Sequence, residues 1–176
     1  MTEAKLLMRK TLYSEAGGFV LLDVEGIMKV WTTPETVFPC DFLAKLADEE
    51  EVAKAMEAGA LLPIVVDESD EYEIAVYEGA PGAKGPGSVL GVESGWFFHA
   101  GSQHVHFLGI GHLKAWAFDR SDGAPISPTM GDSCAHCRWG DNAGFRYIEL
   151  FLEPKSPSSF RRDPPVEIQF LSGSAH

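Results

Sequence analysis

The sequence has little cysteine and no long hydrophobic run. Its 176 residues include three cysteines, an odd and small number that excludes a framework of disulfides. No segment approaches the roughly 20 apolar residues needed to cross a membrane. The N-terminal segment also lacks the apolar stretch of a signal peptide. These absences predict a cytoplasmic protein, whose thiols stay reduced.

Familiar catalytic motifs are missing as well. The chain has no G-x-S-x-G elbow, no P-loop, no G-x-G-x-x-G after a strand and no H-E-x-x-H. Basic clusters are scarce: Arg161 and Arg162 are the one pair of adjacent arginines, and Arg138 and Arg146 are scattered, so a nucleic-acid-binding patch is not expected. The sequence therefore predicts neither a familiar enzyme nor a protein that binds nucleic acid.

Positive charge is scarce, and the net charge of −12 is unevenly distributed. Residues 1–80 contain 17 acidic and 6 basic residues, whereas residues 81–176 contain 9 and 8. An acidic surface of this kind repels nucleic acid and anionic membranes and attracts basic partners. A second interpretation is that the charge only keeps the protein soluble.

The hydrophobic pattern predicts an α+β fold, mostly antiparallel β-sheet, with one main helix at about residues 48–58. Asp48 is a good N-cap, and Glu51 stands three positions on, where it closes a capping box. Gly59 is placed to end the helix in a left-handed conformation. The helix residues expected to face the core are Val52, Ala53 and Met56.

Several apolar segments predict strands. Residues 17–24 form a short buried strand, and a second apolar segment follows at 26–31. Residues 61–66 and 71–77 predict a hairpin around the turn "DESD", because apolar and polar residues alternate in the second segment. The later predicted strands are 95–100, 104–111, 113–118, 146–153 and 166–171.

Residues 79–88, "GAPGAKGPGS", contain too much glycine and proline for a helix or strand. They divide the chain into an acidic α+β half (1–78), a linker or loop (79–93) and a β-rich half (94–171), all expected within one compact domain. Both halves run small residues, apolar strand, tryptophan and cysteine in that order, which raises the hypothesis of a duplication.

Histidines are concentrated on either side of a predicted turn at 100–103. A hairpin there would place His99 opposite His104, with His106 on the same face. Three imidazoles so placed can hold zinc and leave one position for a catalytic water, in a pocket lined by Trp96, Phe98 or Trp116. The alternative is a half-buried sheet face with ordinary hydrogen-bonding histidines.

The C-x-x-C pair Cys134 and Cys137 is the second candidate metal site. Further zinc ligands would have to come from upstream, from His104, His106 or Cys40, and such a closed site would be structural. A redox role is disfavoured, because nearby Asp132 would raise the thiol pKa. The alternative is a pair of small, buried, inert thiols in a loop.

The segments "GGFVLLDVEGIMKVW", "CDFLAKL" and "GALLPIVVDESDEYEIAVYEG" resemble one group of small bacterial immunity proteins that neutralise polymorphic or contact-delivered toxins. The residues that fit the order of that group are Gly17, Gly18, Trp31, Cys40 and Pro63, within residues 16–80. The resemblance implies a cytoplasmic, non-catalytic binding protein without a cofactor.

Three hypotheses follow. The first is an immunity protein that occludes a basic toxin domain, without nucleic acid or membrane as partner. Its predicted contacts are Asp67, Glu68, Asp70 and Glu71 in the turn, flanked by Tyr72 and Tyr77. The second is a zinc-type hydrolase that uses the histidines. The third is a structural-zinc adaptor built on the two cysteines.

Overall fold

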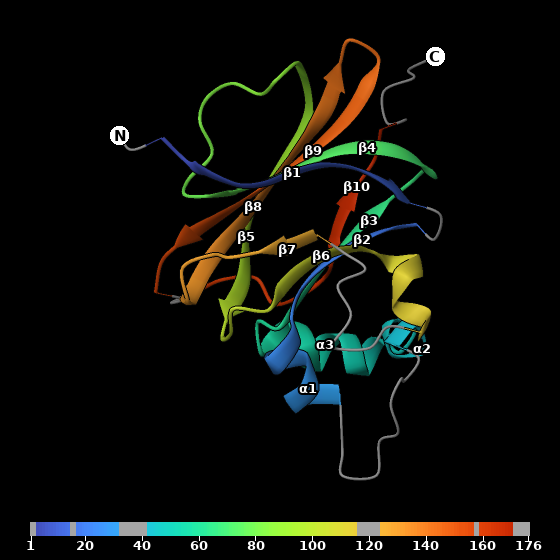
Figure 1. The fold of residues 1–176 in the computed structure, drawn as a ribbon, viewed down its shortest axis with the longest axis vertical. Helices are drawn as coiled ribbons and strands as arrows, with labels where there is room; N and C mark the ends of the chain where they lie inside the picture. Colours follow the sequence, from blue (N-terminus) through green and yellow to red (C-terminus); the bar gives the residue numbers. More distant parts are fainter. Residues whose placement is uncertain (1–2, 15–16, 32–41, 116–123, 157–158, 171–176) are drawn as a thin grey trace.

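The computed structural model describes residues 3–14, 17–31, 42–115, 124–156 and 159–170 (Figure 1). Its strands are β1 (Lys5–Ser14), β2 (Gly18–Asp23), β3 (Leu61–Val66), β4 (Asp70–Glu78), β5 (Ser88–Ala100), β6 (Val105–Gly109), β7 (Ala124–Ile126), β8 (Gly131–Asn142), β9 (Phe145–Pro154) and β10 (Val166–Ile168). Its helices are α1 (Val24–Trp31), α2 (Phe42–Leu46), α3 (Glu49–Glu57) and the 3-10 helix η1 (Ile110–Ala115). The predicted α+β class, dominated by sheet, is confirmed.

The strands form two five-stranded sheets. Sheet A has the order β1-β4-β9-β8-β5, and sheet B has the order β10-β3-β2-β6-β7. Each sheet contains one parallel pair, β4–β9 in sheet A and β10–β3 in sheet B, and its other pairs are antiparallel. Each sheet takes strands from both sides of the glycine- and proline-rich loop 79–87, so neither predicted half forms a sheet of its own.

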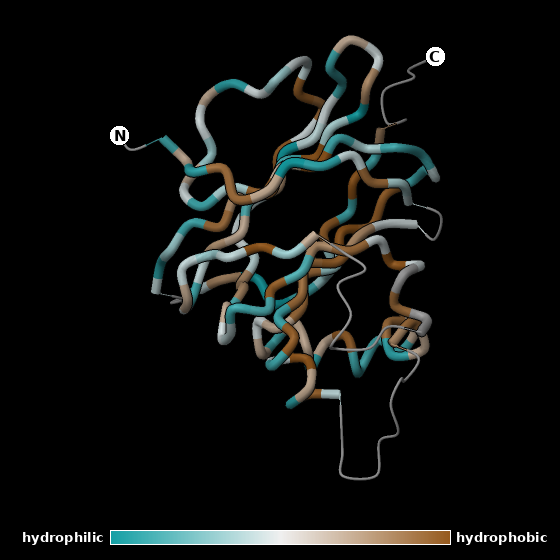
Figure 2. Tube along the Cα trace, viewed as in Figure 1, coloured by the Kyte–Doolittle hydropathy of each residue, from teal (hydrophilic) through white to brown (hydrophobic). Residues whose placement is uncertain are grey.

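The main hydrophobic core lies between the two sheets. On β4 the side chains of Tyr72, Ile74 and Val76 face this core, as their alternation with Glu71 and Glu73 predicts. Figure 2 shows hydrophobic residues concentrated along the strands in the middle of the molecule. Each large apolar side chain fully buried there contributes about 1.5–3 kcal/mol to folding.

A second core joins sheet B to the helices. Most of its members come from the outer faces of β2, β3 and β6 and from α1, α2, α3 and η1. Trp31 stacks on Phe42 with ring centroids 5.8 Å apart, and the Trp31 indole N–H donates to the Glu51 carbonyl at 3.0 Å. Figure 1 shows the helices gathered at one end of the molecule, beyond sheet B. The outer face of sheet A therefore has no helix over it among the described residues.

Helix α3 begins and ends where the sequence predicts. The Asp48 carboxylate accepts hydrogen bonds from the backbone N–H groups of Glu50 and Glu51, at 3.0 and 3.4 Å. The capping box does not close, because the Asp48 N–H donates to the Lys45 carbonyl and the Glu51 side chain pairs with lysines. The buried residues of the helix are Ala55 and Met56. The prediction that Met56 faces the core is therefore confirmed, and the same prediction for Ala53 is wrong because Ala53 is exposed.

The apolar segment 26–31 belongs to helix α1. Its buried side chains, Val24, Ile27 and Trp31, recur at helical spacing, and the Asp23 carboxylate caps the helix by accepting from the Gly26 N–H at 3.1 Å. The Ser102 hydroxyl also donates to the buried Asp23 carboxylate, which ties the loop after β5 to the start of this helix.

The predicted hairpin at 61–77 is wrong, although both of its strands exist. β3 lies in sheet B and β4 lies in sheet A, so the turn between them crosses from one sheet to the other. The physical reason lies in the burial. Sheet A covers one side of β3 and helices cover the other, which accounts for its almost unbroken apolar run, whereas β4 is buried mainly on one face.

No helix among the described residues has both the length and the apolar composition to cross a membrane. Cys40 and Trp116, which the sequence analysis singled out, lie outside the described residues.

Candidate functional site

The outer face of sheet A is covered by no helix in the part of the chain that the structure describes, whereas helices pack on the outer face of sheet B. Glu71, Glu73, Ala75 and Tyr77 project from β4 onto this face, because the residues between them enter the core. On the neighbouring edge strand β1, Tyr13 lies opposite Glu71. The next residues in this row, Thr11 and Arg9, lie opposite Glu73 and Ala75.

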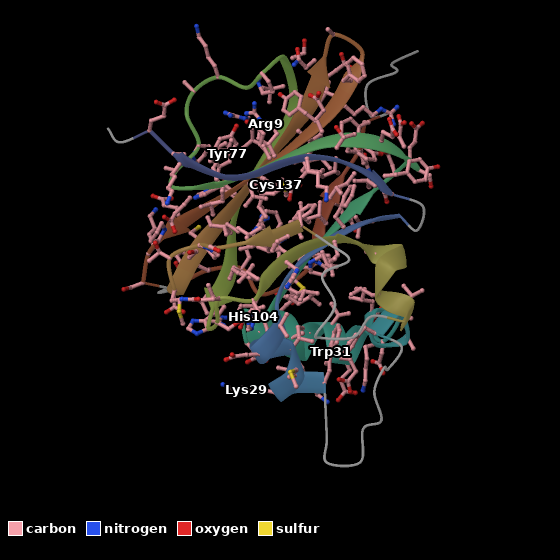
Figure 3. All side chains as sticks on the ribbon, in the orientation of Figure 1. Arg9, Lys29, Trp31, Tyr77, His104 and Cys137 are labelled. Carbon is pink, nitrogen blue, oxygen red and sulfur yellow. The ribbon has the colours of Figure 1, made fainter. Side chains whose placement is uncertain are left out.

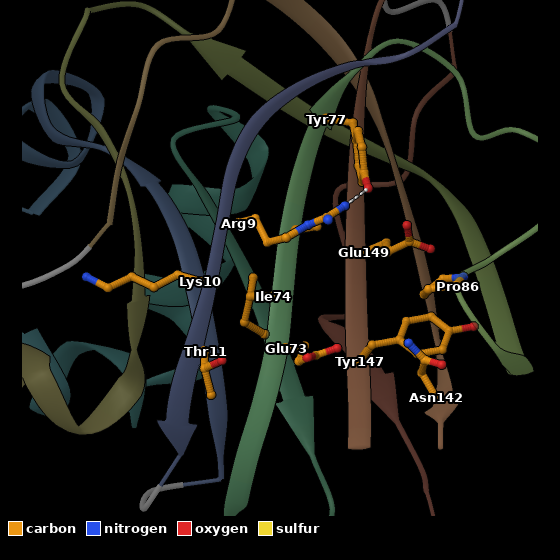
Figure 4. Close-up of a pocket in the computed structure, with 11 residues that line it drawn as sticks. Arg9, Lys10, Thr11, Glu73, Ile74, Tyr77, Pro86, Asn142, Tyr147 and Glu149 are labelled. Atoms are coloured by element: carbon orange, nitrogen blue, oxygen red, sulfur yellow. Dashed lines mark hydrogen bonds between the residues drawn. The ribbon is translucent and has the colours of Figure 1, made fainter. Parts of the chain in front are cut away.

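A hollow of about 510 Å³ opens on this face between β1 and the loop 79–87 (Figure 4). The residues that line it include Arg9, Glu73, Tyr77, Pro86, Tyr147 and Glu149. Ala75 is the small residue of the β4 row, which leaves room between its larger neighbours. The Arg9 guanidinium donates to the Tyr77 hydroxyl oxygen at 3.0 Å across one end of the hollow.

The loop 79–87 is held over the other half of the face by a buried ion pair. The Arg138 guanidinium donates to a Glu149 carboxylate oxygen at 2.8 Å and to the Gly82 carbonyl at 2.6 Å, and it lies over the Phe151 ring at 5.1 Å. Phe151 in turn stacks on Tyr77, with ring centroids 4.9 Å apart. One side of the hollow is therefore formed by tightly packed side chains, in which the charges of Arg138 and Glu149 neutralise each other.

The acidic turn before β4 is largely neutralised within the chain. The Asp67 carboxylate accepts from the Phe170 backbone N–H, with N–O distances of 3.1 and 3.2 Å. The Arg146 guanidinium pairs with Glu68 and also lies 3.7 Å from Asp70. Among the described residues, by contrast, no ion pair engages the exposed carboxylates of Glu71 or Glu73.

The two tyrosines predicted to flank the turn lie in different environments. Tyr72 is completely buried, its ring packs edge-on against Phe19 at 5.6 Å, and its hydroxyl donates to the Glu68 carbonyl at 2.5 Å. Burial raises the pKa of this phenol, although Arg146 opposes the shift. Tyr72 is therefore a core residue and not a surface contact, whereas Tyr77 is half-buried beside the hollow.

The histidine hairpin is wrong, because its two strands belong to different sheets: β5 pairs with β8, and β6 pairs with β2 and β7. His99 is exposed, and its Nδ1 lies 2.7 Å from Asp132. His104 is exposed near the helices (Figure 3), while His106 is buried. Burial, together with the nearby charge of His104, lowers the pKa of His106.

The C-x-x-C segment forms part of strand β8 and not a loop. Because side chains alternate along a strand, Cys134 and Cys137 point to opposite faces, and Cys137 lies in the core between the sheets (Figure 3). Burial raises the pKa of both thiols. Among the described residues, no three His, Cys, Asp or Glu side chains converge as metal ligands.

Two exposed aromatic residues of this face were not among the predicted site residues. Tyr13 on β1 is 50 % exposed, and Phe145 at the start of β9 is 65 % exposed. The sequence did carry a turn signal before Phe145, in Asp141, Asn142 and Gly144, and in the structure Ala143 and Gly144 adopt the positive φ angles of a tight hairpin turn. It held none for Tyr13, whose strand lacks a clean alternation.

No protein-family model matches this chain, and no curated protein matches it in sequence. Two solved structures share its fold. The first is ComJ from Bacillus subtilis, an inhibitor of the DNA-degrading activity of NucA; it is 12 % identical, with a TM-score of 0.53 over 88 % of this chain and 100 % of ComJ. The second is described as crocagin biosynthetic gene J; it is 10 % identical, with a TM-score of 0.50 over 85 % of this chain and 98 % of its own.

Proposed function

We propose that this chain is a non-catalytic inhibitor that binds a basic, nuclease-type toxin domain and occludes it in the bacterial cytoplasm. The observation that carries the proposal is the fold, which this chain shares over almost its whole length with an inhibitor of a DNA-degrading enzyme. The resemblance of residues 16–80 to bacterial immunity proteins supports the same class of function.

The charge of the chain fits such a target. A nuclease must attract a polyanion, so the surface that receives DNA is positively charged. A protein with a net charge of −12 competes for that surface, and the opposite charges accelerate the encounter. Within this proposal the acidic turn residues Asp67, Glu68, Asp70 and Glu71, together with Tyr77, lie at or near the interface.

The direct test is a nuclease inhibition assay. The purified chain is titrated into NucA, and into any nuclease domain that a neighbouring gene proves to encode, while the degradation of supercoiled plasmid is followed. We expect inhibition that is complete at an equimolar ratio, a stable complex in size-exclusion chromatography, and slower association at high salt, because ions screen the attraction.

An unrelated protein of similar size and net charge serves as the control, because charge alone can slow a nuclease by a nonspecific effect. Unchanged plasmid degradation at a large molar excess of the chain, with no complex for either nuclease, contradicts the proposed function.

A further inference from the structure

We propose that the inhibited nuclease docks on the open half of the outer face of sheet A, which we call the β1–β4 face and define by Tyr13, Glu71, Glu73 and Phe145. The partner surface is rich in lysine and arginine. Tyr13 and Phe145 of this chain are the aromatic anchors of the interface. This inference rests on the proposed function and adds to it the place and chemistry of the contact.

The described residues leave this face uncovered. Helices pack over the outer face of sheet B, and the loop 79–87 lies over the β8–β9 side of sheet A, where Arg138 binds the Gly82 carbonyl. Among the described residues nothing comparable lies over the outward side chains at this end of β1 and β4, and Tyr13, Glu71 and Glu73 are all exposed. The neighbouring hollow adds a depression that can receive one protruding side chain.

The two aromatic rings lie on either side of the two carboxylates. Tyr13 pairs across the strands with Glu71. Phe145 lies two residues before Tyr147, which is the parallel partner of Glu73, so Phe145 occupies the same face beside β4. The salt bridge from Arg146 to Glu68 independently places this end of β9 at the start of β4.

This arrangement matches a basic protein surface. Exposed aromatic rings supply contact area at a low cost in side-chain entropy, and arginine or lysine is attracted to their faces. Within the described part of the chain no ion pair engages Glu71 or Glu73, whereas Asp67, Glu68 and Asp70 are engaged inside the chain. The strongest contacts thus lie on the sheet face, and the acidic turn lies at the edge of the interface.

Matched variants test the assignment, with NucA and any nuclease domain that a neighbouring gene proves to encode as probes. The variants of the face are E71Q/E73Q and Y13A/F145A. The control is E49Q/E50Q, which also removes two negative charges, but from exposed positions at the start of α3 in the helix layer. Thermal unfolding of each variant checks that the exposed substitutions leave the fold intact.

We expect Y13A/F145A to raise the Kd for the nuclease by at least about tenfold, as the loss of interface anchors does. We expect E71Q/E73Q to lower the association rate by about tenfold at low salt, and E49Q/E50Q to change it much less. Equal effects of the two charge-neutralised pairs, or wild-type binding by Y13A/F145A, overturn the assignment of the face.

The two proposals fail in different ways. If the wild-type chain neither binds nor inhibits the two nucleases, the proposed function is contradicted. If the wild-type chain inhibits and the variants of the β1–β4 face inhibit equally well, the function stands and the docking face is wrong.

Discussion

Arg138 and Glu149 form a charged pair inside a protein whose other acidic residues mostly lie in water. Both side chains are over nine-tenths buried, and the guanidinium is satisfied by a carboxylate, a backbone carbonyl and an aromatic ring. A buried ion pair stabilises the fold little more than apolar residues of similar size would. Removing one partner is costly, because the other charge then stays buried without compensation. Its structural role is to hold the loop 79–87 beside the hollow.

Glu149→Ala leaves the Arg138 guanidinium buried without its carboxylate. We expect the free energy of unfolding to fall by about 3–5 kcal/mol, measured by urea denaturation. The double variant R138M/E149L removes both charges and should recover much of that loss. A double variant as unstable as Glu149→Ala would show that the ion pair itself, and not the unpaired charge, accounts for the stability.

Helix α3 joins the helix layer to sheet A through the residue that ends it. Gly59 has a φ of +73°, and its carbonyl accepts from the His99 N–H of β5 at 2.8 Å. A Cβ at this position would lie 2.6 Å from the Phe97 ring and 2.9 Å from the His99 nitrogen. Glycine is therefore required at position 59 for two reasons: the positive φ disfavours other residues, and β5 approaches too closely to leave room for a side chain.

Gly59→Ala tests this junction against a matched control. Gly144 also has a positive φ, +88°, but a Cβ there meets nothing within 4 Å. We expect Gly144→Ala to cost about 1–2 kcal/mol from the left-handed conformation alone, and Gly59→Ala to cost clearly more because of the added clash. Urea denaturation measures both variants, and equal losses would contradict the proposed packing of α3 on β5.

At the scale of the whole molecule, burial of weakly acidic groups links stability to pH. It raises the pKa of Tyr72, Tyr147, Cys134 and Cys137, and it is the largest cause in each case. These groups therefore hold their protons to a higher pH in the folded chain than in the unfolded chain. Their contribution is complete below the ordinary values, roughly 8.5 for thiols and 10 for phenols, and falls as the pH rises.

We expect the Tm to stay level from neutral pH to roughly pH 8.5 and then to decline steadily as the solution becomes more alkaline. Thermal unfolding followed by circular dichroism measures it. Tyr147→Phe removes one of the four groups, so its Tm should fall less steeply with pH than that of the wild type. A flat wild-type profile through the phenol range would contradict the burial of these groups.

The sequence by itself determined the charge, the span of helix α3 and the buried face of strand β4. Helix α3 could be located because its cap and its end lie within a dozen residues, and the alternation on β4 identified its buried face. The tertiary structure alone decided that β3 and β4 belong to different sheets and that His99 and His104 do not meet. It also decided that Tyr13 and Phe145 share a face with Glu71 and Glu73. The reason is that a strand's own residues specify which side is apolar, whereas its neighbours are chosen by pairing with segments far along the chain, as Glu73 pairs with Tyr147.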